Sequence, residues 1–158
     1  MWGFVAFKMK IMQNKFMSFA LEEARLAANS GEVPVGAVIV KDNQVIASAH
    51  NLCEEKKNPL LHAEILVINK AMELLGTQRL EDCDLYVTLE PCAMCAGAIS
   101  HARIKRLFFG AYDKIGGCIV SHKHLLDKDS PLRSVEYYCG ICEEPCSQLL
   151  TDFFKKLR

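Results

Sequence analysis

The sequence has no excess of charge of one sign, because its 158 residues include 19 basic and 19 acidic side chains. A neutral chain has no overall field that attracts a polyanion, so any contact with nucleic acid must depend on local patches. Long apolar runs are also missing, since the longest fall far short of the roughly 18 residues that span a membrane. The composition therefore indicates neither a strongly basic nucleic-acid-binding protein nor a membrane-spanning one.

A secretory signal is not evident either. The N-terminus is apolar, but only seven residues precede Lys8, and no small-residue cleavage site follows. We therefore expect a cytoplasmic protein in a reducing environment, where closely spaced cysteines are better suited to metal binding than to disulfides. Eight cysteines have to be assigned on this basis: Cys53, Cys83, Cys92, Cys95, Cys118, Cys139, Cys142 and Cys146.

The spacing of apolar residues predicts alternating helices and strands, with no repeat, low-complexity stretch or linker. Helices are predicted over Lys15–Asn29, His62–Leu75, Cys92–His101 and Cys142–Leu157, and strands over Val33–Val40, Val45–Ala49, Asp84–Leu89, Arg106–Gly110 and Ser134–Tyr138. Asp42-Asn43 marks a hairpin turn, and Pro91 suits the first position of a helix. This order predicts a sheet with helices on both faces. We expect one domain over residues 15–158, preceded by a loose extension over residues 1–14.

Cys92 and Cys95 are spaced to bind one metal ion together. Both fall on one face of the first turn of a predicted helix, where the helix dipole lowers thiol pKa values and favours thiolates. Alone, such a pair can equally be redox-active, half of a structural zinc site or a coincidence. Two thiolates and an imidazole form a zinc-type ligand set. Three protein ligands leave the fourth position for water, as in catalytic zinc sites.

His62 supplies the imidazole, and Glu64 stands two residues after it. In a regular helix their side chains would diverge by about 200°, so we expect the helix to meet the metal end-on, with both residues at its tip. Zinc lowers the pKa of a bound water toward ~7, and Glu64 is the candidate that moves protons to the ring nitrogen and the leaving amine. His-x-Glu alone is usually a surface pair. Together the two segments match the signature of zinc-dependent nucleobase deaminases.

A second cysteine cluster leaves two interpretations open. Cys139, Cys142 and Cys146 are candidates for a structural zinc site, but the sequence offers no obvious fourth ligand. Cysteine is also commonly a small buried hydrophobe, which is the simpler expectation here.

The sequence resembles the bacterial tRNA-specific adenosine deaminases, cytidine deaminase-like hydrolases that convert the wobble adenosine of a tRNA anticodon to inosine. The resemblance runs from about Phe16 to Arg158 and is strongest over Gly31–Val38, His62–Glu64, Leu85–Ala98, Phe109–Asp113 and Asp152–Phe154. It implies an α/β fold, a three-layer α/β/α sandwich around a five-stranded mixed sheet. It also implies a homodimer, one zinc ion per chain and a tRNA anticodon stem-loop as substrate.

The resemblance further implies substrate contacts. By position, Asn51 matches a residue that contacts the target nucleoside, Val33 one that lines the base pocket, and Ala63 one whose backbone N–H meets the base. Asp113 matches an acidic residue near the flanking nucleotide, and Phe153 is a candidate for stacking on anticodon bases. Simpler roles stay open for these residues. Asn51 can be a turn residue, Val33 a core residue and Asp113 a helix cap, and one ring of the Phe153-Phe154 pair can pack in the core.

The resemblance is not complete, and it leaves alternative functions. Tyr112 stands where many family members carry a basic residue, and Cys139 and Cys142 are not family features. One alternative is a deaminase of a free base or nucleotide of the guanine or cytosine type. Another is a catalytically inactive, zinc-stabilised RNA-binding module, against which Glu64 argues. The basic tail Lys155–Arg158 mildly favours RNA as partner.

Overall fold

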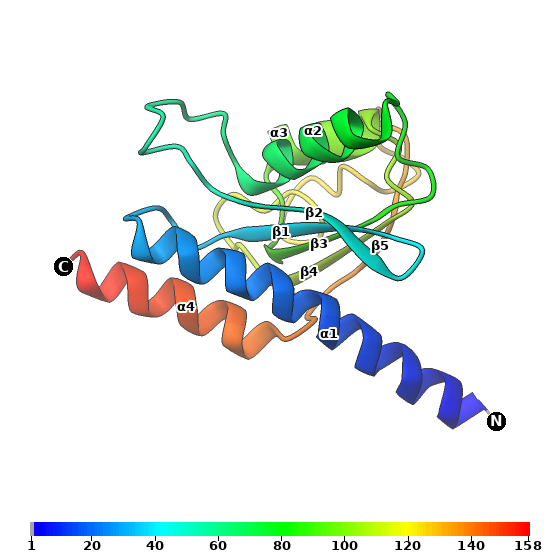
Figure 1. Cartoon of the computed structure of the whole chain (residues 1–158), viewed down its shortest axis with the longest axis horizontal. Coiled ribbons are helices and arrows are strands. Elements are labelled where there is room, and N and C mark those ends of the chain that lie inside the picture. The colour runs from blue at the N-terminus through cyan, green and yellow to red at the C-terminus, as the bar shows by residue number, and fades with distance from the viewer. Residues whose placement is uncertain (1) are drawn as a thin grey trace.

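A five-stranded mixed sheet, in the order β2-β1-β3-β4-β5, forms the middle layer of the computed structural model, which describes residues 2–158. β1 pairs antiparallel with both β2 and β3, whereas β3, β4 and β5 run parallel. The elements in chain order are α1 (Trp2–Asn29), β1 (Gly36–Lys41), β2 (Gln44–His50), α2 (Ala63–Leu75), β3 (Asp84–Leu89), α3 (Ala93–His101), β4 (Arg106–Ala111), β5 (Glu136–Tyr138) and α4 (Glu143–Lys156). Figure 1 shows α2 and α3 on one face and α1 and α4 on the other. The predicted three-layer sandwich is confirmed.

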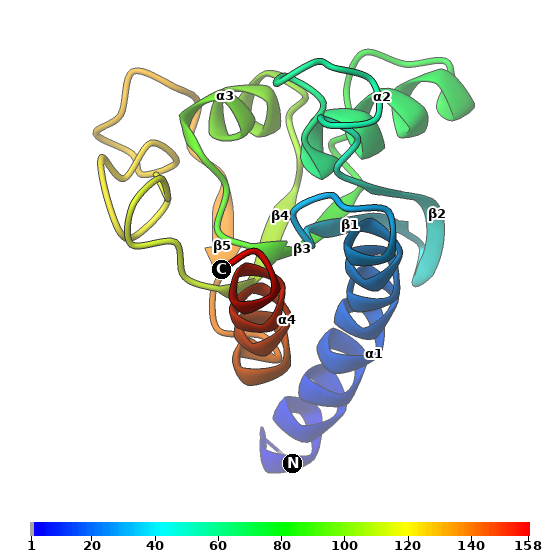
Figure 2. The same cartoon turned by 90° about the vertical axis from the view of Figure 1, so that its left-hand side faces the viewer.

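Alternation along the central strands divides the core between the two faces of the sheet. Facing α2 and α3, the core includes Ala37, Ile39, Leu85, Val87, Leu107 and Phe109. Facing α1 and α4, it includes Val38, Val40, Tyr86 and Phe108. The Tyr86 and Phe108 rings stack with centroids 4.4 Å apart. Because both faces are covered, as Figure 2 shows end-on, the sheet gives the α2 and α3 tips a rigid base.

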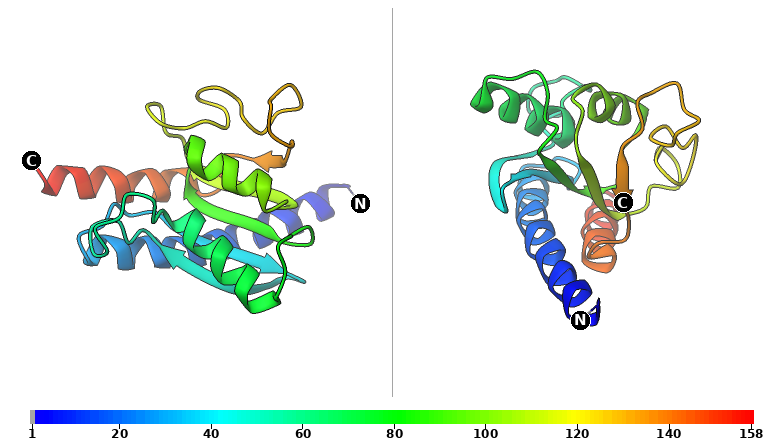
Figure 3. Two further views of the ribbon diagram at one scale, coloured as in Figure 1. Left: turned by 90° about the horizontal axis from the view of Figure 1, so that it is seen from above. Right: turned by 90° about the vertical axis from the view of Figure 1, so that its right-hand side faces the viewer.

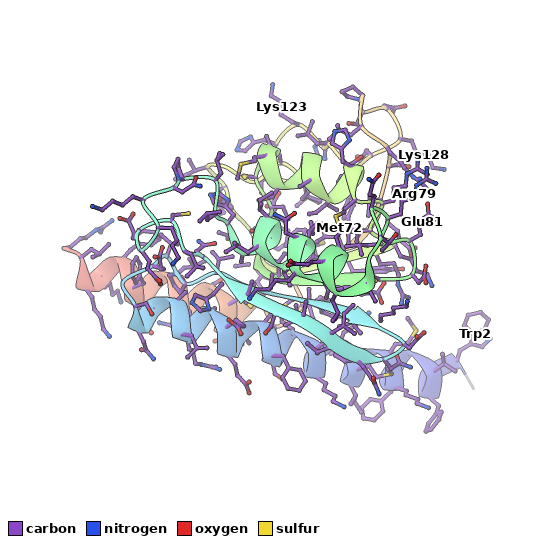
Figure 4. The ribbon with its side chains drawn as sticks, turned by 45° about the horizontal axis from the view of Figure 1, so that its top comes forward. Trp2, Met72, Arg79, Glu81, Lys123 and Lys128 are labelled. Atoms are coloured by element: carbon purple, nitrogen blue, oxygen red, sulfur yellow. The ribbon has the colours of Figure 1, made fainter. Side chains whose placement is uncertain are left out.

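The N-terminal half of α1 corrects the expected loose extension, because residues 2–14 are helical and continuous with the half that packs on the sheet. Met1 lies outside the described residues. The docked half, which includes the buried Phe16 and Met17, supplies a helix nucleus, and further turns then form at little cost in residues without proline. Figure 3 shows this half extending past the sheet, and Figure 4 places Trp2 at its far end, where it is 93% exposed.

Apart from the start of α1, the helix and strand boundaries differ from the predicted ones by a few residues at most. The hairpin turn is confirmed, since Asp42 and Asn43 both take the positive φ that a two-residue turn needs. β1 begins only at Gly36, because Pro34 has no N–H to donate to a ladder and the Val35 N–H donates to the Val33 carbonyl. α3 begins at Ala93, so Pro91 precedes the helix and does not occupy its first position.

Among residues 2–158, no helix has both the length and the apolar composition of a membrane-spanning segment, and this includes the long α1.

α1 lies very close to the sheet, because a Cβ on Gly36 would stand 2.0 Å from the carbonyl oxygen of Ala20. Only glycine therefore lets α1 and β1 approach backbone to backbone.

Candidate active site

The N-terminal tips of α2 and α3 meet beside the sheet and bring together three metal-ligand side chains. His62 caps α2 and Cys92 caps α3, both with extended backbone. The Cys92 and Cys95 sulfurs lie 3.7 and 3.5 Å from His62 Nδ1. One ligand atom from each residue lies within 4.8 Å of the others, so the group can hold a metal ion. Within residues 2–158 no second such group is found, so Cys139, Cys142 and Cys146 are not gathered into a metal site.

The electrostatics of the two sulfurs suit a metal centre. Hydrogen bonds from Cys95 and then from His62 lower the pKa of Cys92 to about 4, against the opposing effect of burial. The same bond to Cys92, together with burial, raises the pKa of Cys95. A lowered thiol pKa favours the thiolate, which is the form that binds a metal cation. Two thiolates and an imidazole fit zinc by their chemistry.

Glu64 lies in the first turn of α2 with its side chain buried, at 4% exposure. Its Oε2 is the one buried side-chain oxygen or nitrogen without a hydrogen-bond partner among the residues that the structure describes. Burial raises the pKa of Glu64 to about 7. A buried carboxyl oxygen without a partner is costly, and such atoms are typical of functional sites.

A cavity of about 200 Å³ opens beside these side chains. It brings together six of the residues singled out in the sequence: Val33, Asn51, His62, Glu64, Cys92 and Asp113. The rest of the lining is Glu32, Val35, Cys53, Glu54, Leu89 and Glu90. Cys95 and Ala63 are buried and are not part of this lining.

Ala63 and Phe153 differ from the other predicted substrate contacts. The Ala63 N–H donates to Asn51 Oδ1 at 2.8 Å, and Asn51 Nδ2 donates to the Val33 carbonyl at 3.3 Å. The Asn51 amide thus joins the tip of α2 to the segment before β1. Phe153 lies half-buried on α4, edge-to-face with Phe154 at 5.4 Å, and is not part of the cavity lining.

Comparison with known proteins agrees with this geometry. The profile of the MafB19-like deaminase family matches residues 11–158. A tRNA-specific adenosine deaminase of Bacillus subtilis is 46% identical over 143 residues, which are 90% of this chain and 89% of the relative. The chain belongs to the tRNA-specific adenosine deaminase family.

Solved structures of deaminases share the fold of this family member. One, from work on A-to-I editing by tRNA:A34 deaminases, has a TM-score of 0.83 and 46% identity, covering 86% of this chain and 99% of its own. Bacillus subtilis guanine deaminase has a TM-score of 0.59 and 43% identity, covering 62% of this chain and 63% of its own. The fold therefore occurs in deaminases named for more than one base.

Two buried glutamates of the cavity were missed by the sequence analysis. Glu32 accepts the N–H groups of Glu54 and Glu55, both at 2.9 Å, and Glu90 accepts bonds from the segment Asp113–Ser121. Their burial could have been inferred from the sequence, because each glutamate stands beside an apolar strand and a proline. A carboxylate in such a place is buried only if it has hydrogen-bond or ion-pair partners.

Proposed function

We propose that this protein hydrolyses the wobble adenosine of a tRNA anticodon to inosine, with one zinc ion per chain held by His62, Cys92 and Cys95. The observation that carries this proposal is the convergence of those three donors beside the unpartnered Oε2 of Glu64, in a chain of this family. We extend the proposal to a single deaminase domain that acts in the cytoplasm as a homodimer.

Zinc bound by the three donors would supply Lewis-acid activation of the attacking water. The reaction forms a bond from the water oxygen to C6 of adenine and breaks the bond from C6 to the exocyclic nitrogen, which leaves as ammonia. Glu64 is placed to take a proton from the water and to return protons to the ring nitrogen and to the amine. Because its Oε2 has no other partner, no existing hydrogen bond has to break first. The burial of Glu64 also keeps bulk water away from these transfers.

The cavity suits one flipped-out base. Val33 and Leu89 offer apolar walls, and Asn51 and Asp113 offer polar groups toward the nucleoside and its flanking nucleotide. Contact of the base with the Ala63 N–H requires that this donor be shared with Asn51. Phe153 lies outside the lining, so its proposed role is stacking on bases of the anticodon loop beyond the target.

Deamination assays on four substrates test this proposal: an anticodon stem-loop, free adenosine, guanine and cytosine. We expect turnover of the stem-loop and little of free adenosine, because contacts remote from the reacting base add binding energy that positions it. The likeness to a guanine deaminase favours guanine as the second candidate. Efficient turnover of guanine with none of the stem-loop would replace the proposed function by that one.

A further inference from the structure

Glu90 is a buried carboxylate of the cavity that the proposed mechanism does not use. Resting on the proposed function, we infer that Glu90 is a positioning residue for the substrate. Its carboxylate fixes the segment Asp113–Ser121, whose first residue lines the pocket, and so sets where Asp113 meets the nucleotide next to the target adenosine.

Five donors converge on the Glu90 carboxylate, which is 2% exposed. Oε1 accepts from the Asp113 N–H at 3.1 Å and from the Ser121 hydroxyl at 2.6 Å. Oε2 accepts the N–H groups of Ile119, Val120 and Ser121 at 3.2, 2.9 and 2.9 Å. All five donors belong to one segment, so a single side chain ties both of its ends.

The charge of Glu90 is balanced by these N–H dipoles, because among residues 2–158 no basic side chain forms an ion pair with it. The segment wraps closely around the carboxylate. A Cβ on Gly117 would stand 2.4 Å from Glu90 Cδ and 2.6 Å from the Asp113 carbonyl oxygen. A segment that encloses one carboxylate this tightly has little freedom to shift independently of it.

Glu90 also connects the segment Asp113–Ser121 to the helix tip that carries Cys92. Its own N–H donates to the Ala111 carbonyl at 2.8 Å, and the Cys118 N–H donates to the Pro91 carbonyl at 2.9 Å. Asp113 is held in turn, because its Oδ1 accepts the N–H groups of Ile115 and Gly116, both at 3.0 Å. The direction of the Asp113 side chain therefore follows from the backbone that Glu90 anchors.

Glu90→Gln separates this role from a general structural one. The glutamine oxygen can keep the three N–H groups at Oε2, and its NH₂ then faces the Asp113 N–H, which loses its acceptor. Since a hydrogen bond to a charged group is lost, we expect KM for the stem-loop to rise about tenfold. We expect kcat within about threefold of wild type, because the metal ligands and Glu64 are untouched.

A double-mutant cycle with Asp113→Ala gives the decisive readout. If Glu90 acts through Asp113, Glu90→Gln will add almost nothing to KM in the Asp113→Ala background. Fully additive effects, an unchanged KM in the single variant, or a fall in kcat with loss of zinc would each overturn the inference. Ser121→Ala, which removes one donor and keeps the carboxylate, provides a milder variant and should raise KM by a smaller factor.

Amide hydrogen exchange tests the anchor independently of any substrate. The amides of Asp113, Ile119, Val120 and Ser121 should be protected in the wild type, and that of Asp113 should exchange faster in Glu90→Gln. Equal exchange in both proteins would refute the anchoring role. A wild type that does not deaminate the stem-loop would refute the proposed function, while the exchange data would still decide whether Glu90 holds the segment.

Discussion

Glu64 and Glu90 are buried in the same pocket, but their carboxylates have opposite surroundings. Oε2 of Glu64 has no partner, and burial raises the pKa of this group to about 7. Burial also acts to raise the pKa of Glu90, but hydrogen bonds from Ser121 and its neighbours outweigh it and hold that pKa below its ordinary value. Burial alone therefore does not distinguish the carboxylate that we propose as the acid–base group from the one that we propose as an anchor of the segment. The number of hydrogen-bond donors around each carboxylate distinguishes the two.

The largest expected effect comes from removing a proposed metal ligand, which breaks the pocket that both glutamates share. Cys92→Ala should lose zinc, turnover and part of its thermal stability, because metal binding is coupled to folding. Elemental analysis should fall from about one zinc ion per chain to nearly none. Full zinc content in this variant would disprove the ligand assignment.

Glu64→Gln should remove the chemistry and leave the pocket standing. Glutamine keeps the size of the side chain but cannot transfer protons, so turnover should fall by roughly 10²–10⁴-fold or more. Zinc content and the circular dichroism spectrum should match those of the wild type. Turnover within a few-fold of wild type would show that Glu64 is not the acid–base group.

Gly117→Ala changes the surroundings of Glu90 and leaves those of Glu64 unchanged, so it tests the difference between the two carboxylates. The new methyl group meets the Glu90 carboxylate, so the segment must shift, at a cost of about 1–3 kcal/mol in the free energy of unfolding. Gly97→Ala is the matched control, since its Cβ on α3 meets nothing within 4 Å. The control should be neutral or stabilising by about 0.5–1 kcal/mol. Chemical denaturation measures both, and equal values would remove the steric argument.

The smallest effect is expected from deleting Lys155–Arg158, which lies outside the pocket and moves neither carboxylate. RNA affinity should weaken by a few-fold, and its logarithmic salt dependence should flatten by roughly 0.7–0.9 for each phosphate that the tail no longer neutralises. Zinc content should not change. Fluorescence anisotropy with a labelled stem-loop across a salt series provides the measurement, and an unchanged slope would exclude the tail as a phosphate-binding element.

Much of the fold was predictable, because its strands and helices bury apolar residues with clear periods. Asp84–Leu89 and the helix ends beside His62 and Cys92 follow from such patterns. The N-terminal half of α1 was missed for the opposite reason. Trp2, Phe4 and Phe7 are all more than half exposed, and they stand in a stretch that is apolar on every side and defines no single face.

The parts of the candidate site that consist of residues close together in the sequence were predictable. The parts that depend on hydrogen bonds to backbone groups far away in the sequence were not. His-x-Glu and Cys-x-x-Cys are local patterns. The donors to Glu90 come from residues 113–121, and nothing near Glu90 in the sequence specifies them. The bond between Asn51 and the Ala63 N–H is likewise a product of folding, and it places a competitor at a donor that the family resemblance assigns to the base.

The order of elements along the chain has a consequence for biosynthesis. His62, Cys92 and Cys95 all precede β4, whose Leu107 and Phe109 belong to the same buried cluster as Ala96 and Ile99 of α3. A chain emerging from the ribosome therefore exposes its three donors as a flexible set before the strand and the segment Asp113–Ser121 give them a fixed geometry. Without a fixed geometry, the affinity of such donors for divalent metals follows the general order in which copper binds more tightly than zinc. For the proposed zinc site, we therefore expect metal selection to depend on completing the parallel half of the sheet.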